Sequence, residues 1–199
     1  MTEPVLTLAS ASKIRADLLR AAGVDIHIDP ARVDEDSVKS ALRAQGVSPR
    51  DQADALAELK AVKIGARHGG LVLGCDQILA CDGLAFDKAE TRSQARANLV
   101  MLRGRRHELH SAAVLVRNGA PVWRHIATAR LTMRSFSDAF LDAYLDDVGD
   151  AALSCVGAYQ LEGRGAQLFS AVQGDYFAIL GLPLLELLDV LREQGALAA

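Results

Sequence analysis

Aromatic side chains and long apolar runs are both scarce in this chain of 199 residues. Only 5% of the residues are aromatic although 50% are hydrophobic, so leucine, alanine and valine must supply most of the core packing. No apolar run is long enough to span a bilayer. Residues 1–8 also lack the basic region and long apolar stretch of a secretory signal. We therefore expect a soluble, cytoplasmic protein without a membrane partner.

Cysteine and net charge are limited too, and each excludes a class of protein. The three cysteines have no short repeated spacing, which argues against a disulfide framework or a zinc site and fits a reducing compartment. With 22 basic and 25 acidic residues the net charge is −3, so no global positive field exists to hold a nucleic-acid backbone. An anionic ligand would need a local basic cluster.

Segments typical of strands and of helices are interleaved along the chain, which favours an α/β fold. Serine caps, glycines and prolines mark most of the helix ends. The predicted helices are residues 14–22, 49–67, 90–103, 138–148 and 183–193. The predicted strands are residues 5–9, 24–28, 71–80, 108–117 and 122–134. The segment 29–46 is polar, contains Pro30 and an acidic group at 34–36, and is assigned to no helix or strand, and residues 118–121 are expected to form a turn.

An aspartate interrupts the apolar strand at 71–80. Asp76 lies between Leu73 and Ile78 in the sequence, and burying an unpaired carboxylate there would be costly. The residue therefore needs a metal ion, a lysine or several hydrogen-bond donors. The alternative is that the carboxylate is harmlessly exposed at a strand end.

The first strand-to-helix junction carries Ser10, Ser12, Lys13 and Arg15. The free amides of a first helical turn attract phosphate, and neighbouring hydroxyl and basic groups strengthen this attraction. An ordinary helix cap with solvated basic residues would have the same sequence.

Three further charged positions have both a functional and a structural interpretation. The acidic run 34–36 could face a metal ion or simply be a solvated surface. Lys60 and Lys88 could bind phosphate as point charges, or lie on the surface as most lysines do.

The histidines and cysteines are interpreted structurally first. His107 and His110 are candidate bases, but their spacing matches no recognised metal motif. Cys75 and Cys155 are better explained as small buried hydrophobic residues than as nucleophiles.

Several short motifs occur in a fixed order along nearly the whole chain. They are Leu8-Ala9-Ser10-Ala11-Ser12 with Arg15, Val33-Asp34-Glu35, Leu56-Ala57 with Lys60-Ala61, Gly74-Cys75-Asp76-Gln77, Lys88, Gly104 with His107, Gly157-Ala158-Tyr159 to Glu162-Gly163, and Gly174-Asp175-Tyr176 through Gly181-Leu182-Pro183. Each alone is weak, but together they resemble the Maf family of nucleoside triphosphate pyrophosphatases. Lys13, Ile14 and Ala89 depart from the family pattern, and these departures concern base recognition more than phosphate chemistry.

The resemblance implies one domain over residues 1–199, with a mixed twisted sheet flanked by helices and two lobes around a nucleotide-binding cleft. It implies hydrolysis of nucleoside triphosphates to monophosphate and pyrophosphate, a Mg²⁺ or Mn²⁺ cofactor, and a homodimer. The implied catalytic residues are Asp76 as general base, Lys60 and Lys88. The implied substrate-binding residues are Ser10, Ile14, Arg15, Gln77 and Glu162, and the implied metal ligands are Glu35 and Asp76.

The resemblance also bears on the base. Asp76-Gln77 with Cys155 and Glu162 resembles the branch that acts on 7-methyl-GTP, and the branch that acts on dTTP and UTP is the alternative. Two other classes stay open. A nucleotide-binding regulator of septum formation would have little turnover and would not need a base among its phosphate ligands. A non-catalytic interaction domain would leave Asp76 unexplained.

Overall fold

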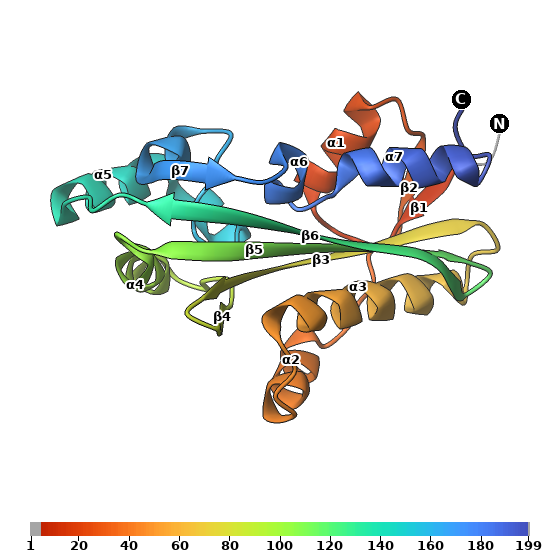
Figure 1. Cartoon of the computed structure of the whole chain (residues 1–199), viewed down its shortest axis with the longest axis horizontal. Coiled ribbons are helices and arrows are strands. Elements are labelled where there is room, and N and C mark those ends of the chain that lie inside the picture. Colours follow the sequence, from red (N-terminus) through yellow and green to blue (C-terminus); the bar gives the residue numbers. More distant parts are fainter. Residues whose placement is uncertain (1–4, 199) are drawn as a thin grey trace. The chain divides into compact units, whose positions relative to one another are not determined.

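The computed structural model describes residues 5–198, so the prediction of no signal sequence falls partly outside the described residues, at 1–4 (Figure 1). The chain divides into two compact units. The first contains the residues up to Gln77, Ser111–Ala127 and those from Asp175 onward. The second contains Ile78–His110 and Thr128–Gly174.

Strands and helices alternate as predicted. Within residues 5–198 the strands are β1 (Leu6–Leu8), β2 (Ile26–Ile28), β3 (Leu71–Cys81), β4 (Leu84–Phe86), β5 (Arg106–Arg117), β6 (Ala120–Met133) and β7 (Phe169–Gln173). The helices there are α1 (Lys13–Ala21), α2 (Glu35–Ala44), α3 (Pro49–Gly65), α4 (Arg92–Leu102), α5 (Asp138–Val148), the 3-10 helices η1 (Gly149–Ser154) and η2 (Arg164–Leu168), α6 (Tyr176–Ile179) and α7 (Leu184–Glu193).

The described strands form one mixed sheet in the order β2-β1-β3-β5-β6-β7, with β4 paired to β3. Strand β1 is parallel to both β2 and β3, whereas the β3–β4 and β6–β7 pairs are antiparallel. The mixed α/β class is therefore confirmed. The predicted turn is also confirmed, because Asn118 and Gly119 have φ angles of 53° and 78° between β5 and β6. Two positive φ angles suit a tight hairpin turn.

In the first unit, helices cover both faces of the strands: α1 and α7 lie on one face and α3 on the other (Figure 1). The α1 and α7 face holds an apolar core of mostly leucine and alanine side chains. Its members include Leu6, Leu8, Leu19, Leu73, Cys75, Ala113, Leu115, Leu187 and Leu191. Because side chains alternate along a strand, the neighbours of Leu73 and Cys75 on β3 point toward α3 instead.

Gly74 is the position where α3 approaches β3 most closely. A Cβ atom at Gly74 would lie 2.1 Å from the carbonyl oxygen of Ala57 and 2.6 Å from the amide nitrogen of Ala61. Both contacts are to helix backbone, which cannot move aside as a flexible side chain can. A glycine is therefore required for α3 to pack at this distance.

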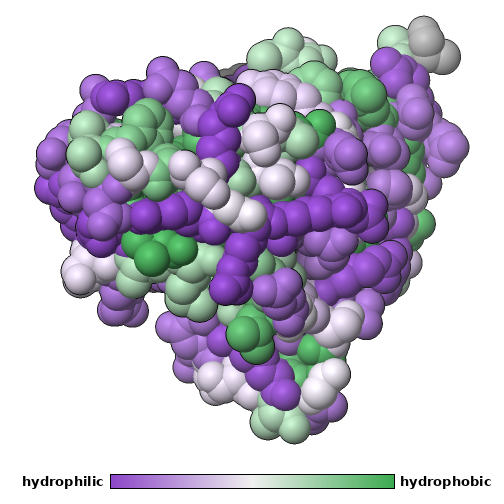
Figure 2. Space-filling model, turned by 60° about the vertical axis from the view of Figure 1, so that its left-hand side comes forward, coloured by the Kyte–Doolittle hydropathy of each residue, from purple (hydrophilic) through white to green (hydrophobic). Residues whose placement is uncertain are grey.

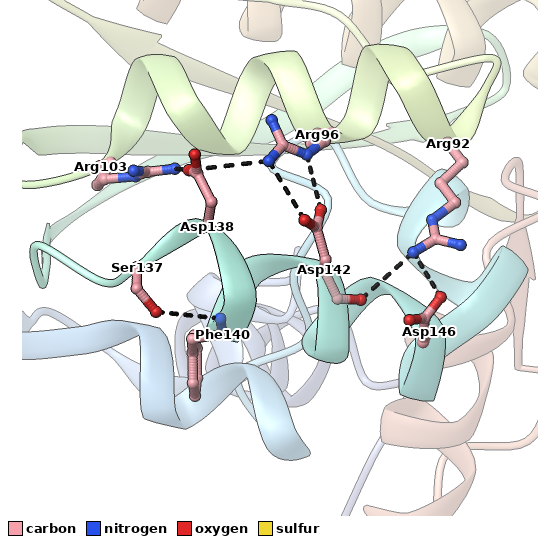
Figure 3. A network of polar contacts seen from close by, with 8 residues as sticks. All are labelled: Arg92, Arg96, Arg103, Ser137, Asp138, Phe140, Asp142 and Asp146. Atoms are coloured by element: carbon pink, nitrogen blue, oxygen red, sulfur yellow. Dashed lines mark hydrogen bonds and ion pairs between the residues drawn. The ribbon is translucent and has the colours of Figure 1, made fainter.

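In the second unit, α4 and α5 are joined by a ladder of arginine and aspartate side chains (Figure 3). Arg92 pairs with Asp146, Arg96 with Asp142, and Arg103 with Asp138, at N–O distances of 2.5, 2.7 and 2.5 Å. The aspartates are four residues apart, so they lie along one face of α5. Apart from Arg103, which is 25% exposed, these side chains are 38–66% exposed, so each pair contributes little alone and the ladder mainly fixes how the two helices align.

The sequence predicted no helix in the polar segment 29–46, yet residues Glu35–Ala44 form α2. Asp34 caps this helix by accepting a hydrogen bond from the Ser37 amide at 3.1 Å. The signal was present in the sequence: an Asx cap followed by acidic residues in the first turn is typical of a helix start.

Surface hydropathy is mixed. The face in Figure 2 is largely hydrophilic, with small separate hydrophobic areas. Exposed large hydrophobic side chains lie on different elements, for example Leu84 on β4, Met101 on α4 and Leu185 on α7. No helix within residues 5–198 combines the length and apolar character needed to cross a membrane.

Candidate active site

The start of α1 combines a hydroxyl group with a guanidinium group. Ser10 follows β1 and is buried, and Ser12 caps the helix by accepting the amide of Arg15. The Arg15 side chain folds back: Nη1 donates to Ser10 Oγ at 3.1 Å and to the Cys75 carbonyl at 3.2 Å, and Nε donates to the Gly181 carbonyl at 2.8 Å. Nη2 of the guanidinium carries two further N–H donors, which with the helix amides suit an anionic ligand.

A charged cluster lies on the α3 face of the same unit. Lys60 Nζ is 2.7 Å from Asp76 Oδ1 and 2.8 Å from Glu35 Oε1. The side chains of Lys60 and Asp76 are only 8% and 7% exposed, whereas Glu35 is 38% exposed. The sequence required a partner for a buried Asp76, and the structure supplies Lys60.

Local packing explains why these groups meet. Asp76 follows Gly74 by two residues on β3, so it points toward α3, where Lys60 lies one turn beyond Ala57. Glu35 is the first residue of α2, so the start of that helix brings its carboxylate to Lys60. Of the predicted acidic run, Glu35 is the member that contacts this cluster.

One oxygen of this cluster has no hydrogen-bond partner within residues 5–198. Asp76 Oδ2 is buried and accepts no hydrogen bond from the part of the chain that the structure describes. Buried carboxylate oxygens are normally satisfied, and exceptions call for an explanation such as an ion or a catalytic role.

The donor set fits a hard divalent cation that is shared with a substrate. Among residues 5–198, no group of three histidine, cysteine, aspartate or glutamate side chains could hold a metal ion. Mg²⁺ does not need such a group, because it is commonly bound by one or two carboxylates together with substrate phosphates. Glu35 and Asp76 provide two carboxylates of that kind.

Gln77 and Ile14 belong to the same unit. The Gln77 amide nitrogen donates to Ser111 Oγ at 2.8 Å and to the carbonyls of Ala178 and Ile179 at 3.1 and 3.0 Å. Any contact with a nucleotide base would therefore have to come from its carbonyl oxygen. Ile14 lies in the first turn of α1 and is partly exposed.

Lys88 and Glu162 belong to the second unit, and both are exposed. Their charges act on Cys155: burial raises the pKa of its thiol, Glu162 raises it further and Lys88 lowers it. Arg164, two residues after Glu162, pairs with Asp147 at 3.2 Å.

Cys75 and His107, which the sequence predicted to be structural, are both buried. All three cysteines are free, and burial raises the pKa of Cys75 to about 11, which disfavours the thiolate a nucleophile needs. His107 is 1% exposed, and its Nε2 lies 2.9 Å from the hydroxyl of Tyr159. Burial lowers the pKa of His107 to about 4, so this histidine is neutral at pH 7.

Two residues with direct links to the site were not found from the sequence. Ser111, on β5, is 1% exposed and contacts Gln77, and Gly181 accepts a hydrogen bond from Arg15. For Ser111, the available signal was a serine just before the apolar run 112–116. For Gly181, a glycine before Leu182-Pro183 indicated a turn but not its contact with Arg15.

This chain is similar to known proteins along nearly its whole length. The family model described as Maf-like protein matches residues 5–194. Over 191 residues, 96% of this chain and 98% of the relative, the chain is 54% identical to a nucleoside triphosphate pyrophosphatase of Paramagnetospirillum magneticum. It is 52% identical to a protein of the same name from Caulobacter vibrioides, over 96% of each chain. It is 49% identical to a 7-methyl-GTP pyrophosphatase of Mesorhizobium japonicum, over 99% of each chain.

A buried carboxylate–lysine pair beside Cys75, whose carbonyl accepts a hydrogen bond from Arg15 at the start of α1, is suited to a polyanionic ligand. The matches cover nearly the whole chain at about half identity, and they show that the chain belongs to the Maf family.

Proposed function

We propose that this Maf-family hydrolase cleaves nucleoside triphosphates between the α- and β-phosphates, releasing a nucleoside monophosphate and pyrophosphate. Relatives at about half identity carry the name nucleoside triphosphate pyrophosphatase. The observation that supports the proposal most is Asp76, a buried carboxylate with one oxygen on Lys60 and the other unpartnered among the described residues.

The triphosphate is bound by groups that supply positive charge. Ser10, Arg15 and the amides at the start of α1 bind phosphate oxygens, and Lys60 adds an ammonium group. Lys88, from the second unit, is proposed as a further phosphate ligand that stabilises the departing pyrophosphate. An arginine fork can contact two phosphate oxygens at once, whereas each lysine acts as a point charge.

Asp76 acts as the general base. Its free carboxylate oxygen removes a proton from a water molecule as the water oxygen attacks the α-phosphorus. The bond from that phosphorus to the bridging oxygen breaks, and its electron pair leaves with pyrophosphate. No covalent intermediate is needed, which agrees with the raised pKa of the Cys75 thiol.

Glu35 and Asp76 are proposed to hold a Mg²⁺ or Mn²⁺ ion together with the substrate. When bound, such an ion neutralises phosphate charge and orients the substrate. The two carboxylates of Glu35 and Asp76, which meet at Lys60, support this assignment, and holding the ion through a water molecule would leave Asp76 Oδ2 available as the base.

For the base, we propose 7-methyl-GTP as the favoured substrate, and dTTP or UTP is the alternative. The support is the relative from Mesorhizobium japonicum, together with Glu162 and Gln77. A carboxylate at Glu162 can accept both the N1–H and the exocyclic amine of guanine, and N7 methylation makes that ring cationic. We also propose that the enzyme is a homodimer.

The experiment is metal-dependent product analysis on a nucleotide panel. Purified protein is incubated with 7-methyl-GTP, dTTP, UTP and ATP, with Mg²⁺, Mn²⁺ or EDTA, and without added pyrophosphatase. We expect equal amounts of monophosphate and pyrophosphate, abolished by EDTA. Stoichiometric orthophosphate would refute the reaction, and nucleotide binding without turnover would favour the regulatory alternative.

A further inference from the structure

The C-terminal motif from Asp175 to Pro183 has no part in the chemistry above, yet it is tied tightly to the site. Its first residue caps the short helix α6, because Asp175 Oδ1 accepts the Ala178 amide at 2.7 Å. The carbonyl groups at the end of α6 then face two side chains of the sheet. These carbonyls belong to Ala178 and Ile179.

Ser111 and Gln77 hold this helix end. Ser111 Oγ donates to the Ala178 carbonyl at 2.6 Å, and Gln77 Nε2 donates to both carbonyls and to Ser111 Oγ. Ser111 is 1% exposed, so these bonds form away from water, where leaving a carbonyl unpaired would be costly. The end of α6 is therefore fixed relative to β3 and β5.

Gly181 extends this fixed segment to Arg15. Its φ angle is 100°, a conformation that favours glycine, and its carbonyl accepts Arg15 Nε at 2.8 Å. A Cβ atom at Gly181 would lie 3.3 Å from both Nε and Nη2 of Arg15. The backbone here thus sets the direction of the guanidinium, and a side chain at this position would crowd it.

The two ends of this arrangement meet β3 on either side of the proposed base. Arg15 Nη1 donates to the carbonyl of Cys75, and the side chain of Gln77 holds α6. Asp76 lies between these two residues and points to the opposite face. Residues 75–77 of β3 therefore fix both the direction of the Arg15 side chain and the position of Asp76.

We propose that Ser111 and Gly181 are positioning residues for the triphosphate: they fix α6 and the following turn so that Arg15 presents its Nη2 donors to phosphate. The proposal rests on the proposed function only in that Arg15 binds the triphosphate. Neither residue touches the substrate; both act through Arg15.

The test measures equilibrium binding of inorganic tripolyphosphate by calorimetry, so it needs no turnover. Ser111→Ala should weaken binding about tenfold, the effect of misaligning a charge-assisted hydrogen bond. Ser170→Ala is the matched control, because Ser170 also donates to a backbone carbonyl, at 3.2 Å, but lies in the second unit and is exposed. This control should bind as the wild type does.

A second background separates positioning from general damage. In Arg15→Lys protein, which keeps a positive charge but lacks the fork, Ser111→Ala should change binding by less than about twofold. A tenfold loss that persists in this background, or no loss in the wild-type background, would overturn the proposal. Gly181→Ala is expected to behave like Ser111→Ala and serves where that variant does not fold. Tripolyphosphate binding that follows this pattern without nucleotide cleavage would refute the proposed function alone.

Discussion

At the scale of single residues, the Lys60–Asp76 pair is better explained by function than by stability. Both side chains are more than nine-tenths buried, and removing two charges from water costs about as much as their attraction returns. Asp76 Oδ2 also lacks a partner among the described residues. A pair selected for stability alone would have that oxygen satisfied.

Asp76→Asn tests this interpretation. The amide is nearly the same size, so the variant should fold, but it removes the general base and one negative charge. We expect kcat to fall about a hundredfold or more, the contribution of a positioned acid–base group. Steady-state kinetics and circular dichroism measure the two effects. A folded variant with nearly full activity would rule out Asp76 as the base.

Glu162→Gln tests the proposed base preference. The carboxylate suits the two donors of guanine, whereas a glutamine both donates and accepts and so suits uracil and thymine better. We expect the preference for 7-methyl-GTP over dTTP and UTP to narrow by about 1–3 kcal/mol in kcat/KM. A wild-type enzyme that favours dTTP or UTP would contradict the branch assignment and leave the pyrophosphatase reaction untouched.

At this scale the sequence indicates some site residues and not others. Asp76 is anomalous in an apolar strand, so its need for a partner was predictable. The contact of Arg15 with Gly181 joins residues 166 positions apart, and that of Gln77 with Ser111 joins residues 34 apart. Local patterns carry no information on such pairings, because they depend on how α6 packs against the sheet.

At the scale of elements, the predicted strands and helices largely match the structure, and the misses have physical causes. The strands β4 and β7 have three and five residues, too few to show a clear alternation. Helix α2 was missed because its apolar side is short: Val38 and Leu42, four residues apart, are partly buried, and none of its residues is fully buried. The cap at Asp34 was a further signal of the helix start.

Gly74→Ala tests how α3 is placed on β3. The added Cβ would meet the α3 backbone at 2.1 Å, so the helix must shift and Lys60 must move from Asp76. We expect a loss of about 1–3 kcal/mol in unfolding free energy, as for other overpacked sites, together with lower activity. Gly69→Ala is the control, since nothing lies within 4 Å of its added Cβ. Equal stability of the two variants in urea unfolding would contradict this packing.

At the scale of the whole molecule, stability should depend on pH through His107. Its folded pKa of about 4 lies below the ordinary 6.5, so between these values the unfolded chain binds more protons. The contribution of the neutral ring is fully present above pH 6.5 and is lost as the pH falls toward 4. The difference between the two pKa values corresponds to about 3 kcal/mol in the free energy of unfolding.

Urea unfolding from pH 7 to pH 4 measures this loss. His107→Gln should flatten the decline, because a glutamine does not titrate. His125→Gln removes a histidine that is 36% exposed in its side chain and should keep the wild-type slope. If the free energy of unfolding fell equally steeply with pH in all three proteins, His107 would not control the loss of stability at low pH.

The central claim, attack of water on the α-phosphorus, is tested most directly by hydrolysis in water enriched in ¹⁸O. Purified protein is incubated with a nucleoside triphosphate and Mg²⁺ in this water, and the masses of the products are measured by mass spectrometry. Our account predicts one ¹⁸O atom in the nucleoside monophosphate and none in the pyrophosphate. Label in pyrophosphate, or in released orthophosphate, would place the attack at another phosphorus and contradict the account.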